Sequence, residues 1–401
     1  MTAAVHLRPG HVRPVFLGHP WVYAQAIARV DGAPAAGDPV VVLDPRGNAL
    51  GSGYYSPGSA IPVRLMCRDG GRALDAAFLR GRIADAVALR RDTLGLGPGR
   101  ACTGWRAVNS EGAGLPGLVV DVFEDSAVVQ FLTIGMKRRA DALVDALCAV
   151  TDVTRVYEST SPRHQKLEGF EATDGLLRGD GPAPLTFVEN GVRFALAPPG
   201  DAAGGQKTGY YFDQRDNRAL VASFARGKRV LDAFAFVGGF GLAAARAGAT
   251  AVHCIDSGAA AVATGEALAR DNGLDGIVRF TRGDVRKVLE ALDAEGQRFD
   301  LVIVDPPKLA HAPREVEQAL GLYRRLNAAA ARRLVSGGML VSCSCSGSVG
   351  ADDFLRAVNA GVRDAGRDAS LLDLRGAALD HPVALASAEG RYLKCALSVV
   401  R

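Results

Sequence analysis

The strongest constraint on the fold is the regular alternation of apolar strand-like runs and amphipathic helical segments after residue 228. Strands are predicted at 229–234, 251–256, 277–281, 299–305, 339–343, 370–372 and 393–400, and helices lie between most of them at 242–247, 259–272, 285–295, 315–334 and 354–365. The strand at 339–343 is expected to follow a turn at Gly337-Gly338. Strict alternation of this kind is typical of a doubly wound α/β sheet with helices on both faces. We therefore predict a seven-stranded sheet in a C-terminal domain, residues 186–401.

Two smaller domains are predicted before this sheet. Residues 1–72 hold short β-type runs at close spacing, as in a small β-barrel. Residues 73–185 are expected to form an α+β domain of the order strand-strand-helix-strand-strand, preceded by a helix at 78–94. An Asn190-Gly191 turn predicts a hairpin over 187–194. The basic segment Ser161–Lys166 is predicted to be a loop, either in contact with a phosphate backbone or simply exposed.

Composition narrows the class of protein. The chain has 401 residues, 48% hydrophobic and 22% charged, as expected of a globular protein. A net charge of +4 is compatible with nucleic-acid binding without requiring it. No run of 18 apolar residues occurs and Met1–Pro14 does not resemble a signal peptide, so we expect a cytoplasmic protein without a membrane span. Seven scattered cysteines argue against a disulfide framework, and none has the spacing of a zinc site, so no metal is expected.

Acidic residues stand at the ends of four successive predicted strands: Asp232, Asp256, Asp284 and Asp305. Ligands of open α/β sheets bind at this edge. The glycine-rich turn 236–241 follows the first strand, and glycines there let the backbone approach a ligand at a helix N-terminus. Taken alone, this turn and Asp256 also fit a dinucleotide site, in which Asp256 would bind a ribose, so a nicotinamide cofactor stays open.

Three of the acids favour S-adenosylmethionine as the cofactor. Asp232 is placed to reach the ammonium group of a methionine moiety, and Asp284 to accept from an adenine amino group. Asp305-Pro306-Pro307 has no function in hydride transfer. The structural alternative for any one of these acids is a helix N-cap, and Asp284 is well placed to cap the next helix.

Two cysteines, one residue apart, stand at the carboxyl end of the strand predicted at 339–343. A thiol beside a methyl donor indicates a nucleophile, although small buried residues are the alternative for both Cys343 and Cys345. On the pattern alone either thiol could react, because both would share one face of a strand. Cys345 lies further toward the edge of the sheet, where a substrate must bind.

These motifs together resemble those of class I methyltransferases with a Rossmann-like domain: Asp232-Ala233-Phe234, Gly238-Gly239-Phe240-Gly241, Asp256, Asp284 and Asp305-Pro306-Pro307-Lys308. Two further segments, Lys207–Arg215 and Ser344-Cys345-Ser346-Gly347, are similar to bacterial 23S rRNA cytosine methyltransferases of the RlmI type. The N-terminal His19-Pro20-Trp21-Val22 resembles the PUA domain of that family. The resemblance covers essentially the whole chain. It departs at Val237, where the family often has a small hydroxyl residue, and at the second thiol, Cys343.

The resemblance implies transfer of a methyl group from S-adenosylmethionine to carbon 5 of a cytosine in 23S rRNA, through a covalent adduct with Cys345. Asp305 would contact the base, and the implied cofactor-binding residues are Tyr210, Tyr211, Gln214, Asp232, Phe234, Gly238, Gly239, Asp256, Asp284 and Asp305. The expected partner is 23S rRNA, with no membrane or metal, and a homodimer is compatible with the sequence. Contacts to RNA are expected from the barrel and the middle domain, with Arg8, Arg13 and Arg64 as candidates.

Several other functions stay open at this point. Methylation of uracil carbon 5 would use the same thiol chemistry, whereas methylation of a purine amine needs no thiol. A nicotinamide-dependent oxidoreductase fits the glycine-rich turn but not Asp305-Pro306-Pro307. A non-catalytic RNA-binding module explains the barrel but not the four acids at the strand ends.

Overall fold

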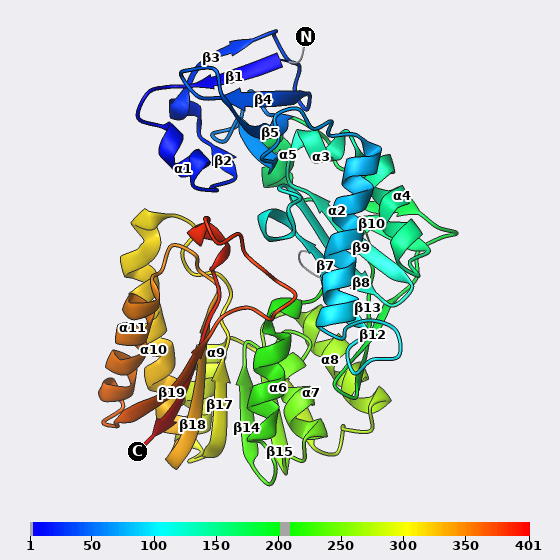
Figure 1. The fold of residues 1–401 in the computed structure, drawn as a ribbon. Helices are drawn as coiled ribbons and strands as arrows, with labels where there is room; N and C mark the ends of the chain where they lie inside the picture. The colour runs from blue at the N-terminus through cyan, green and yellow to red at the C-terminus, as the bar shows by residue number, and fades with distance from the viewer. Residues whose placement is uncertain (1–2, 201–208) are drawn as a thin grey trace. The chain divides into compact units, whose positions relative to one another are not determined.

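The computed structural model describes residues 3–200 and 209–401, and the chain divides into two compact units (Figure 1). Unit 1 comprises Met1–Phe187, Ala195–Phe212 and Leu379–Gly390. Unit 2 comprises Val188–Phe194, Asp213–Ala378 and Arg391–Arg401. The chain therefore passes from one unit to the other several times. Within the described residues, no helix combines the length and the apolar character needed to cross a membrane.

The first sheet of unit 1 has six strands in the order β2-β6-β5-β4-β1-β3. Their bounds, with those of helix α1, are β1 Ala3–Leu7, α1 Val12–Phe16, β2 Trp21–Val22, β3 Ile27–Asp31, β4 Pro39–Leu43, β5 Ala49–Tyr55 and β6 Val63–Cys67. Alternate residues such as Val40 and Val42 point into a small core that also contains Val5 and Leu7. The sequence pattern did not predict β1 and β3. Strand β3 is an edge strand with little burial, so it lacks a clear apolar alternation.

The second sheet of unit 1 has the order β11-β10-β9-β8-β7. Its strands are β7 Gly104–Asn109, β8 Leu118–Phe123, β9 Ser126–Phe131, β10 Arg155–Glu158 and β11 Gly175–Arg178. The accompanying helices are α2 Ala76–Ala88, which continues as a π-helical turn Leu89–Thr93, α3 Ile134–Lys137, α4 Ala140–Val150 and α5 Pro162–Glu168. Phe78 and Ile83 of α2 and Leu147 of α4 pack into the core of this sheet. The predicted hairpin is present as the antiparallel pair β8 and β9.

The prediction of a loop at Ser161–Lys166 was wrong, because helix α5 occupies Pro162–Glu168. Pro162 stands in the first turn, where its fixed φ and missing N–H favour helix initiation. Gly169 ends the helix with φ of 72°, a conformation that glycine adopts without strain. These start and stop signals outweighed the polar composition that suggested a loop.

The predicted Asn-Gly hairpin is confirmed as β12 Leu185–Glu189 and β13 Val192–Leu196. Asn190 and Gly191 have φ of 49° and 82°, as a type I′ turn requires.

Unit 2 contains the seven-stranded sheet, with the order β16-β15-β14-β17-β18-β20-β19. Its strands are β14 Arg229–Ala233, β15 Ala251–Asp256, β16 Val278–Arg282, β17 Phe299–Val304, β18 Leu334–Ser344, β19 Ala369–Arg375 and β20 Lys394–Val400. The helices between and before them are α6 Arg215–Ser223, α7 Gly239–Arg246, α8 Ala259–Asp271, α9 Val285–Ala294, α10 Val316–Arg333 and α11 Ala351–Asp364. The first five strands in chain order are parallel, and β20 runs antiparallel to β18 and β19. This confirms the predicted seven-stranded doubly wound domain.

The strand order reverses its direction between β14 and β17, which are hydrogen-bonded neighbours. A crevice at such a switch point is where ligands of open α/β sheets bind. The strands on either side are almost fully buried, with Leu231, Val302 and Leu340 in one core with Tyr323 of α10 and Phe354 of α11. This core holds the carboxyl ends of the strands in a fixed position.

The predicted turn at Gly337-Gly338 lies instead inside strand β18, which extends back to Leu334. The register with β17 shifts there, because Phe299 lies opposite Leu334 but Leu301 lies opposite Met339. Gly337 has φ of 78°, so the glycine pair forms an irregularity within the strand rather than its beginning.

Candidate active site

The carboxyl ends of β14, β17 and β18 bring three of the predicted site residues to one edge of the sheet. Ala233 lies opposite Val304, and Val304 lies opposite Ser342. The backbone N–H of Asp305 donates to the carbonyl of Ala233 at 3.3 Å. Asp232, Asp305 and Cys345 therefore stand on three adjacent strands or directly after them.

The glycine-rich turn after β14 is conformationally unusual. Phe234 and Phe236 have φ of 65° and 54°, in a region that non-glycine residues rarely occupy and that costs free energy. The N–H of Phe236 donates to Asp256 Oδ2 at 2.8 Å, which helps to hold the turn. Gly238 has φ of 85°, and a Cβ there would lie 2.6 Å from the ring of Phe280. Gly239 begins helix α7, so the predicted positions Phe234, Gly238 and Gly239 all belong to this turn.

The Asp232 carboxyl group is almost completely buried, with 1% of the residue exposed. Its Oδ2 accepts from the N–H of Gly241 at 2.8 Å, while its Oδ1 has no hydrogen-bond partner among the described residues. Burial, and then the neighbouring Asp305 and Asp256 carboxylates, raise the pKa of Asp232 to about 7, against the opposing effect of the Gly241 hydrogen bond. A buried carboxylate oxygen of this kind is stabilised by a cationic donor. The ammonium group of S-adenosylmethionine fits this requirement.

Asp256 ends strand β15 and is half-buried. Each of its oxygens accepts one backbone hydrogen bond of 2.8 Å, Oδ1 from Gly258 and Oδ2 from Phe236. A carboxylate oxygen can accept a second hydrogen bond, so this carboxylate has the capacity to bind ribose hydroxyls as well.

Asp284 caps helix α9, the structural alternative considered for this residue. Its Oδ1 accepts from the N–H groups of Arg286 and Lys287 at 2.9 and 3.3 Å. The Arg286 side chain, followed by the Lys287 N–H, lowers the pKa of this exposed carboxyl. A contact to adenine stays a prediction, because the cap accounts for the position of this side chain without a ligand.

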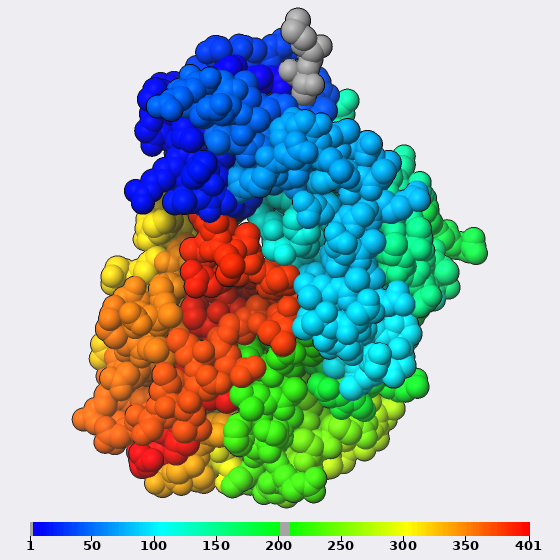
Figure 2. Space-filling view, in the orientation of Figure 1, coloured from blue at the N-terminus to red at the C-terminus, as the bar shows by residue number. Residues whose placement is uncertain are grey.

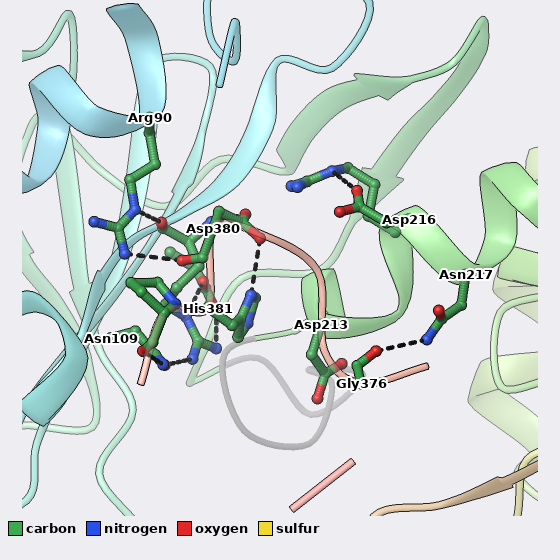
Figure 3. A network of polar contacts seen from close by, with 12 residues as sticks. Arg90, Asn109, Asp213, Asp216, Asn217, Gly376, Asp380 and His381 are labelled. Carbon is green, nitrogen blue, oxygen red and sulfur yellow. Dashed lines mark hydrogen bonds and ion pairs between the residues drawn. The ribbon is translucent and has the colours of Figure 1, made fainter. Parts of the chain in front are cut away.

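Gln214 lies in the short 3-10 turn Phe212–Gln214 before α6 and is directed at Asp305. Its Nε2 donates to Asp305 Oδ2 at 3.1 Å, and its Oε1 accepts from Asn217 Nδ2 at 2.7 Å. Asn217 Nδ2 also donates to the Gly376 carbonyl at 3.1 Å (Figure 3). Gln214, predicted as a cofactor-pocket residue, is thus placed to orient the Asp305 carboxylate.

Tyr210 and Tyr211 belong to unit 1, whereas the strand ends that carry Asp232 and Asp305 belong to unit 2. The Tyr210 ring is buried in an aromatic cluster, with its centroid 4.8 Å from that of Phe187 and 5.3 Å from that of Phe212. Tyr211 is half-buried. Their assignment to the cofactor pocket stays a prediction. Lys207 and Thr208 of the same motif lie outside the described residues.

The two thiols at the end of β18 have different environments. Cys343 is fully buried and lies opposite Cys395 of β20. The Cys395 thiol, together with burial, raises the pKa of Cys343 well above its ordinary value, so this thiol stays protonated. Cys345 follows the last strand residue, Ser344, and is half-buried. Of the two candidates, Cys345 has the position expected of a nucleophile.

Hydrogen bonds that the sequence did not predict hold the turn around Cys345. The Tyr323 hydroxyl donates to Ser344 Oγ at 2.9 Å and lies 3.3 Å from Ser346 Oγ. Ser346 Oγ accepts from the N–H groups of Leu309 and Ala310, both at 3.1 Å. The only available signal was the pair of serines flanking the cysteine, because the sequence alone does not show which side chain of the preceding helix α10 faces this turn.

Two of the arginines considered for RNA contact are engaged within unit 1. Arg64 forms an ion pair with the buried Glu168 at 3.4 Å, and Arg8 Nε donates to the Ile27 carbonyl at 2.9 Å. Arg13 is exposed on α1. Arg64 therefore has a structural function in joining β6 to α5.

Comparison with known proteins agrees with this geometry. Residues 125–372 match the model of an S-adenosylmethionine-dependent methyltransferase family, and residues 5–68 match that of a PUA-like domain. The chain is 38% identical to ribosomal RNA large subunit methyltransferase I of Shewanella denitrificans over 397 residues, 98% of each chain.

Two solved structures share the whole fold. A proposed SAM-dependent methyltransferase from Streptococcus mutans superimposes with a TM-score of 0.82 at 19% identity, over 100% of both chains. A proposed methyltransferase solved with SAH, the demethylated product of the cofactor, gives a TM-score of 0.84 at 19% identity, also over 100% of both chains.

These matches favour S-adenosylmethionine over a nicotinamide cofactor for the turn after β14, as the buried Asp232 oxygen also does. The N-terminal sheet is a PUA-like domain. The chain therefore belongs to the family of S-adenosylmethionine-dependent methyltransferases that includes the ribosomal RNA large subunit methyltransferase I proteins.

Proposed function

We propose that this protein transfers a methyl group from S-adenosylmethionine to carbon 5 of a cytosine in 23S rRNA, with Cys345 as the nucleophile. The observation that carries the proposal is the difference between the two thiols at the end of β18. Cys343 is buried against Cys395, whereas Cys345 is partly exposed beyond the strand, next to the Asp305 strand end. Methylation of a purine amine would need no such thiol.

The chemistry assigns a separate function to each group. The Cys345 thiolate adds to carbon 6 of cytosine, which turns the ring into an enamine and makes carbon 5 nucleophilic. When bound, S-adenosylmethionine supplies an electrophilic methyl group. After methylation, loss of the proton from carbon 5 to a base re-forms the double bond and expels the Cys345 thiolate. Asp305, held by Gln214, is positioned to hydrogen-bond the cytosine.

The cofactor would be held by the residues at the strand ends. Asp232 would meet the ammonium group with its unpaired buried oxygen, and Asp256 the ribose hydroxyls. Phe234, Gly238 and Gly239 would form the turn against which the cofactor lies. Asp284 is assigned to the adenine edge, together with its capping function.

The substrate assignment rests on the relatives, which are named for the large-subunit ribosomal RNA. We assign residues 1–72 to an RNA-binding PUA domain, 73–185 to an α+β middle domain and 186–401 to the methyltransferase domain. A target base must be unpaired or flipped out of its helix to reach the thiol. We place the protein in the cytoplasm, in agreement with its seven scattered cysteines, which do not suggest a disulfide framework.

The test is methyl transfer to rRNA. Unmethylated rRNA is incubated with labelled S-adenosylmethionine and the protein, then digested to nucleosides, and the labelled nucleoside is identified. We expect 5-methylcytidine from the wild-type protein and from Cys343→Ala. Cys345→Ala should lower the rate by at least about a thousandfold, because the removed group forms the covalent adduct.

Cofactor binding provides the control. Cys345→Ala should bind S-adenosylmethionine like the wild type, as measured by calorimetry. Label on 5-methyluridine would keep the thiol mechanism and change the base. Label on a purine, or equal loss of activity in Cys343→Ala and Cys345→Ala without loss of folding, would refute the assignment of Cys345.

A further inference from the structure

Lys394, the first residue of β20, is a buried cation at the end of the sheet. Only 6% of the residue is exposed. Its Nζ donates to the carbonyl of Ser346 at 2.7 Å and to the carbonyl of Val349 at 2.9 Å. These two carbonyls belong to the turn that begins with Cys345, so the ammonium group is fixed to the segment that carries the proposed nucleophile.

A lysine is an unusual residue in this place. The other residues of β20 from Cys395 to Leu397 are apolar and buried, and burial of an ammonium group costs free energy unless hydrogen bonds compensate it. An ammonium group has three N–H donors, of which the two carbonyls take two. The two carbonyls offset part of this cost, and the positive charge remains able to act on a neighbouring anion.

An acidic group lies near the turn that carries Cys345. Asp305 follows the adjacent strand β17, and its carboxylate raises the pKa of the Cys343 thiol, two residues before Cys345. Tyr323 hydrogen-bonds the two serines that flank the cysteine, and burial raises the pKa of this hydroxyl, so it stays neutral and supplies no positive charge. A thiolate at Cys345 therefore needs a fixed positive charge within reach.

We propose that Lys394 is a positioning residue for the reaction, whose ammonium group both fixes the Cys345 turn and stabilises the Cys345 thiolate. This inference rests on the proposed function, because only a thiol nucleophile needs such a charge. The thiol proton is released to solvent and Lys394 keeps its own proton, so Lys394 acts through charge and hydrogen bonds and not as an acid or base.

The pKa of Lys394 agrees with this arrangement. Burial lowers it to about 8, Cys345 acts in the opposite direction and raises it, and Lys308 lowers it further. An interaction that favours the ammonium form in the presence of the thiolate favours the thiolate to the same extent in the presence of the ammonium group. The groups that act on the pKa of Lys394 are therefore the Cys345 thiol and one cation, the exposed Lys308.

The test measures the apparent pKa of the Cys345 thiol directly. Full-length protein, without RNA or cofactor, is alkylated with iodoacetamide from pH 5.5 to 10, and the rate at each cysteine is followed by peptide mass spectrometry. Cys67 on β6 of unit 1 is the internal standard. We expect Cys345 in the wild type to titrate below about 8.5, the value of an ordinary thiol.

Three variants separate charge from structure. Lys394→Met removes the charge and should raise the apparent pKa of Cys345 by about one unit or more, a tenfold loss of thiolate near neutral pH. Lys394→Arg keeps the charge and should leave the pKa near that of the wild type. Lys228→Met removes an exposed lysine before the amino end of β14 and should change nothing.

The proposal is overturned if Cys345 in folded Lys394→Met titrates as in the wild type. If Lys394→Met does not fold, the wild-type titration decides, since a pKa at or above about 8.5 rules out stabilisation of the thiolate. The outcome is independent of the methylation assay. A low Cys345 pKa with no 5-methylcytidine would refute the proposed function, whereas 5-methylcytidine with an ordinary Cys345 pKa would refute only the function of Lys394.

Discussion

At the scale of single residues, Asp232 lies in an environment very different from water. It is buried, one oxygen has no hydrogen-bond partner within the described chain, and two more carboxylates lie near it. Its folded-state pKa of about 7 lies above the ordinary 3.8. Between these two pH values the folded protein keeps a proton on Asp232 that the unfolded chain releases. The contribution of this group to stability is therefore fully present at acid pH and is lost as the pH rises toward 7. A cation bound at this oxygen would offset the free-energy cost of ionising the buried Asp232.

Asp232→Asn should separate stability from cofactor binding. The amide keeps an acceptor for the Gly241 N–H and carries no charge. At pH 8 the variant without cofactor should be more stable than the wild type by at least about 1.4 kcal/mol, which corresponds to one pKa unit. At pH 4 this gain should disappear. Affinity for S-adenosylmethionine should fall by about 1–3 kcal/mol, because the charged partner of the ammonium group is lost.

Thermal unfolding at both pH values, with and without S-adenosylmethionine, measures both effects. Asp271→Asn makes the same change at an exposed position at the end of α8 and should leave the unfolding curves unchanged. An equal cofactor-induced shift in Asp232→Asn and the wild type would remove the ammonium contact.

At the scale of elements, Ser346 joins two loops that follow neighbouring strands. Its hydroxyl accepts from the backbone of Leu309 and Ala310, after β17, and stands in the turn after β18. Tyr323 of α10 lies 3.3 Å from the same hydroxyl. The Asp305 and Cys345 loops are therefore held together by one side chain, which fixes the distance between the two groups proposed to act on the base.

Ser346→Ala should impair this coupling. The buried N–H of Ala310 and the partly buried N–H of Leu309 lose their acceptor, so we expect a loss of about 1–3 kcal/mol in the free energy of unfolding. We also expect a lower kcat with nearly unchanged cofactor affinity, because the cofactor-binding turn after β14 is not altered. Chemical denaturation and single-turnover methylation provide the two measurements.

Ser348→Ala is the matched control, since Ser348 is exposed two residues later in the same turn. Equal effects of the two substitutions would mean that general loosening of the turn, and not the hydrogen bonds of Ser346, sets the rate.

At the scale of the whole molecule, the chain leaves the seven-stranded sheet between β19 and β20 to contribute residues 379–390 to unit 1. This segment contains the fully exposed Leu385 and lies at the surface (Figure 2). It is anchored by Arg90, whose buried guanidinium donates to the carbonyl of Asp380 (Figure 3). The same guanidinium donates to the carbonyls of Arg106 and Ala86. Asp380 Oδ2 also accepts from the Arg106 N–H at 2.9 Å. The last strand of the catalytic sheet thus follows a segment bound to unit 1.

Arg90→Ala should release this segment. Three carbonyls lose the Arg90 side chain as a donor and a fully buried side chain is removed, so we expect unit 1 to be destabilised by about 3 kcal/mol or more. Limited proteolysis followed by mass spectrometry should reveal new cleavage between residues 379 and 390. Arg91→Ala, at the exposed neighbouring position, should resemble the wild type. Resistance of Arg90→Ala to cleavage in this segment would show that other contacts hold it.

Much of the fold of unit 2 could be predicted because its signals are local. Apolar runs, glycine turns and helix caps lie within a few residues of one another, and the predicted bounds of β15 and α8 agree with the structure to within one residue. The edge strands β3, β7 and β11 were not predicted. Their burial depends on neighbours that are distant in the sequence, so their own residues carry a weak pattern. Helix α5 was missed because its polar composition concealed its start and stop signals.

The sequence by itself determined the doubly wound sheet, the order of acids along the strand ends and the presence of two thiols after the fifth strand, because strand and helix periodicities and turn residues are properties of neighbouring positions. Only the tertiary structure decided how these groups differ. Cys343 is buried opposite Cys395 of the last strand, and Gln214 is directed at Asp305. Lys394 reaches the Cys345 turn because β20 enters the sheet beside β18. Burial and hydrogen-bond partners come from residues far apart in the chain, and no local pattern encodes them.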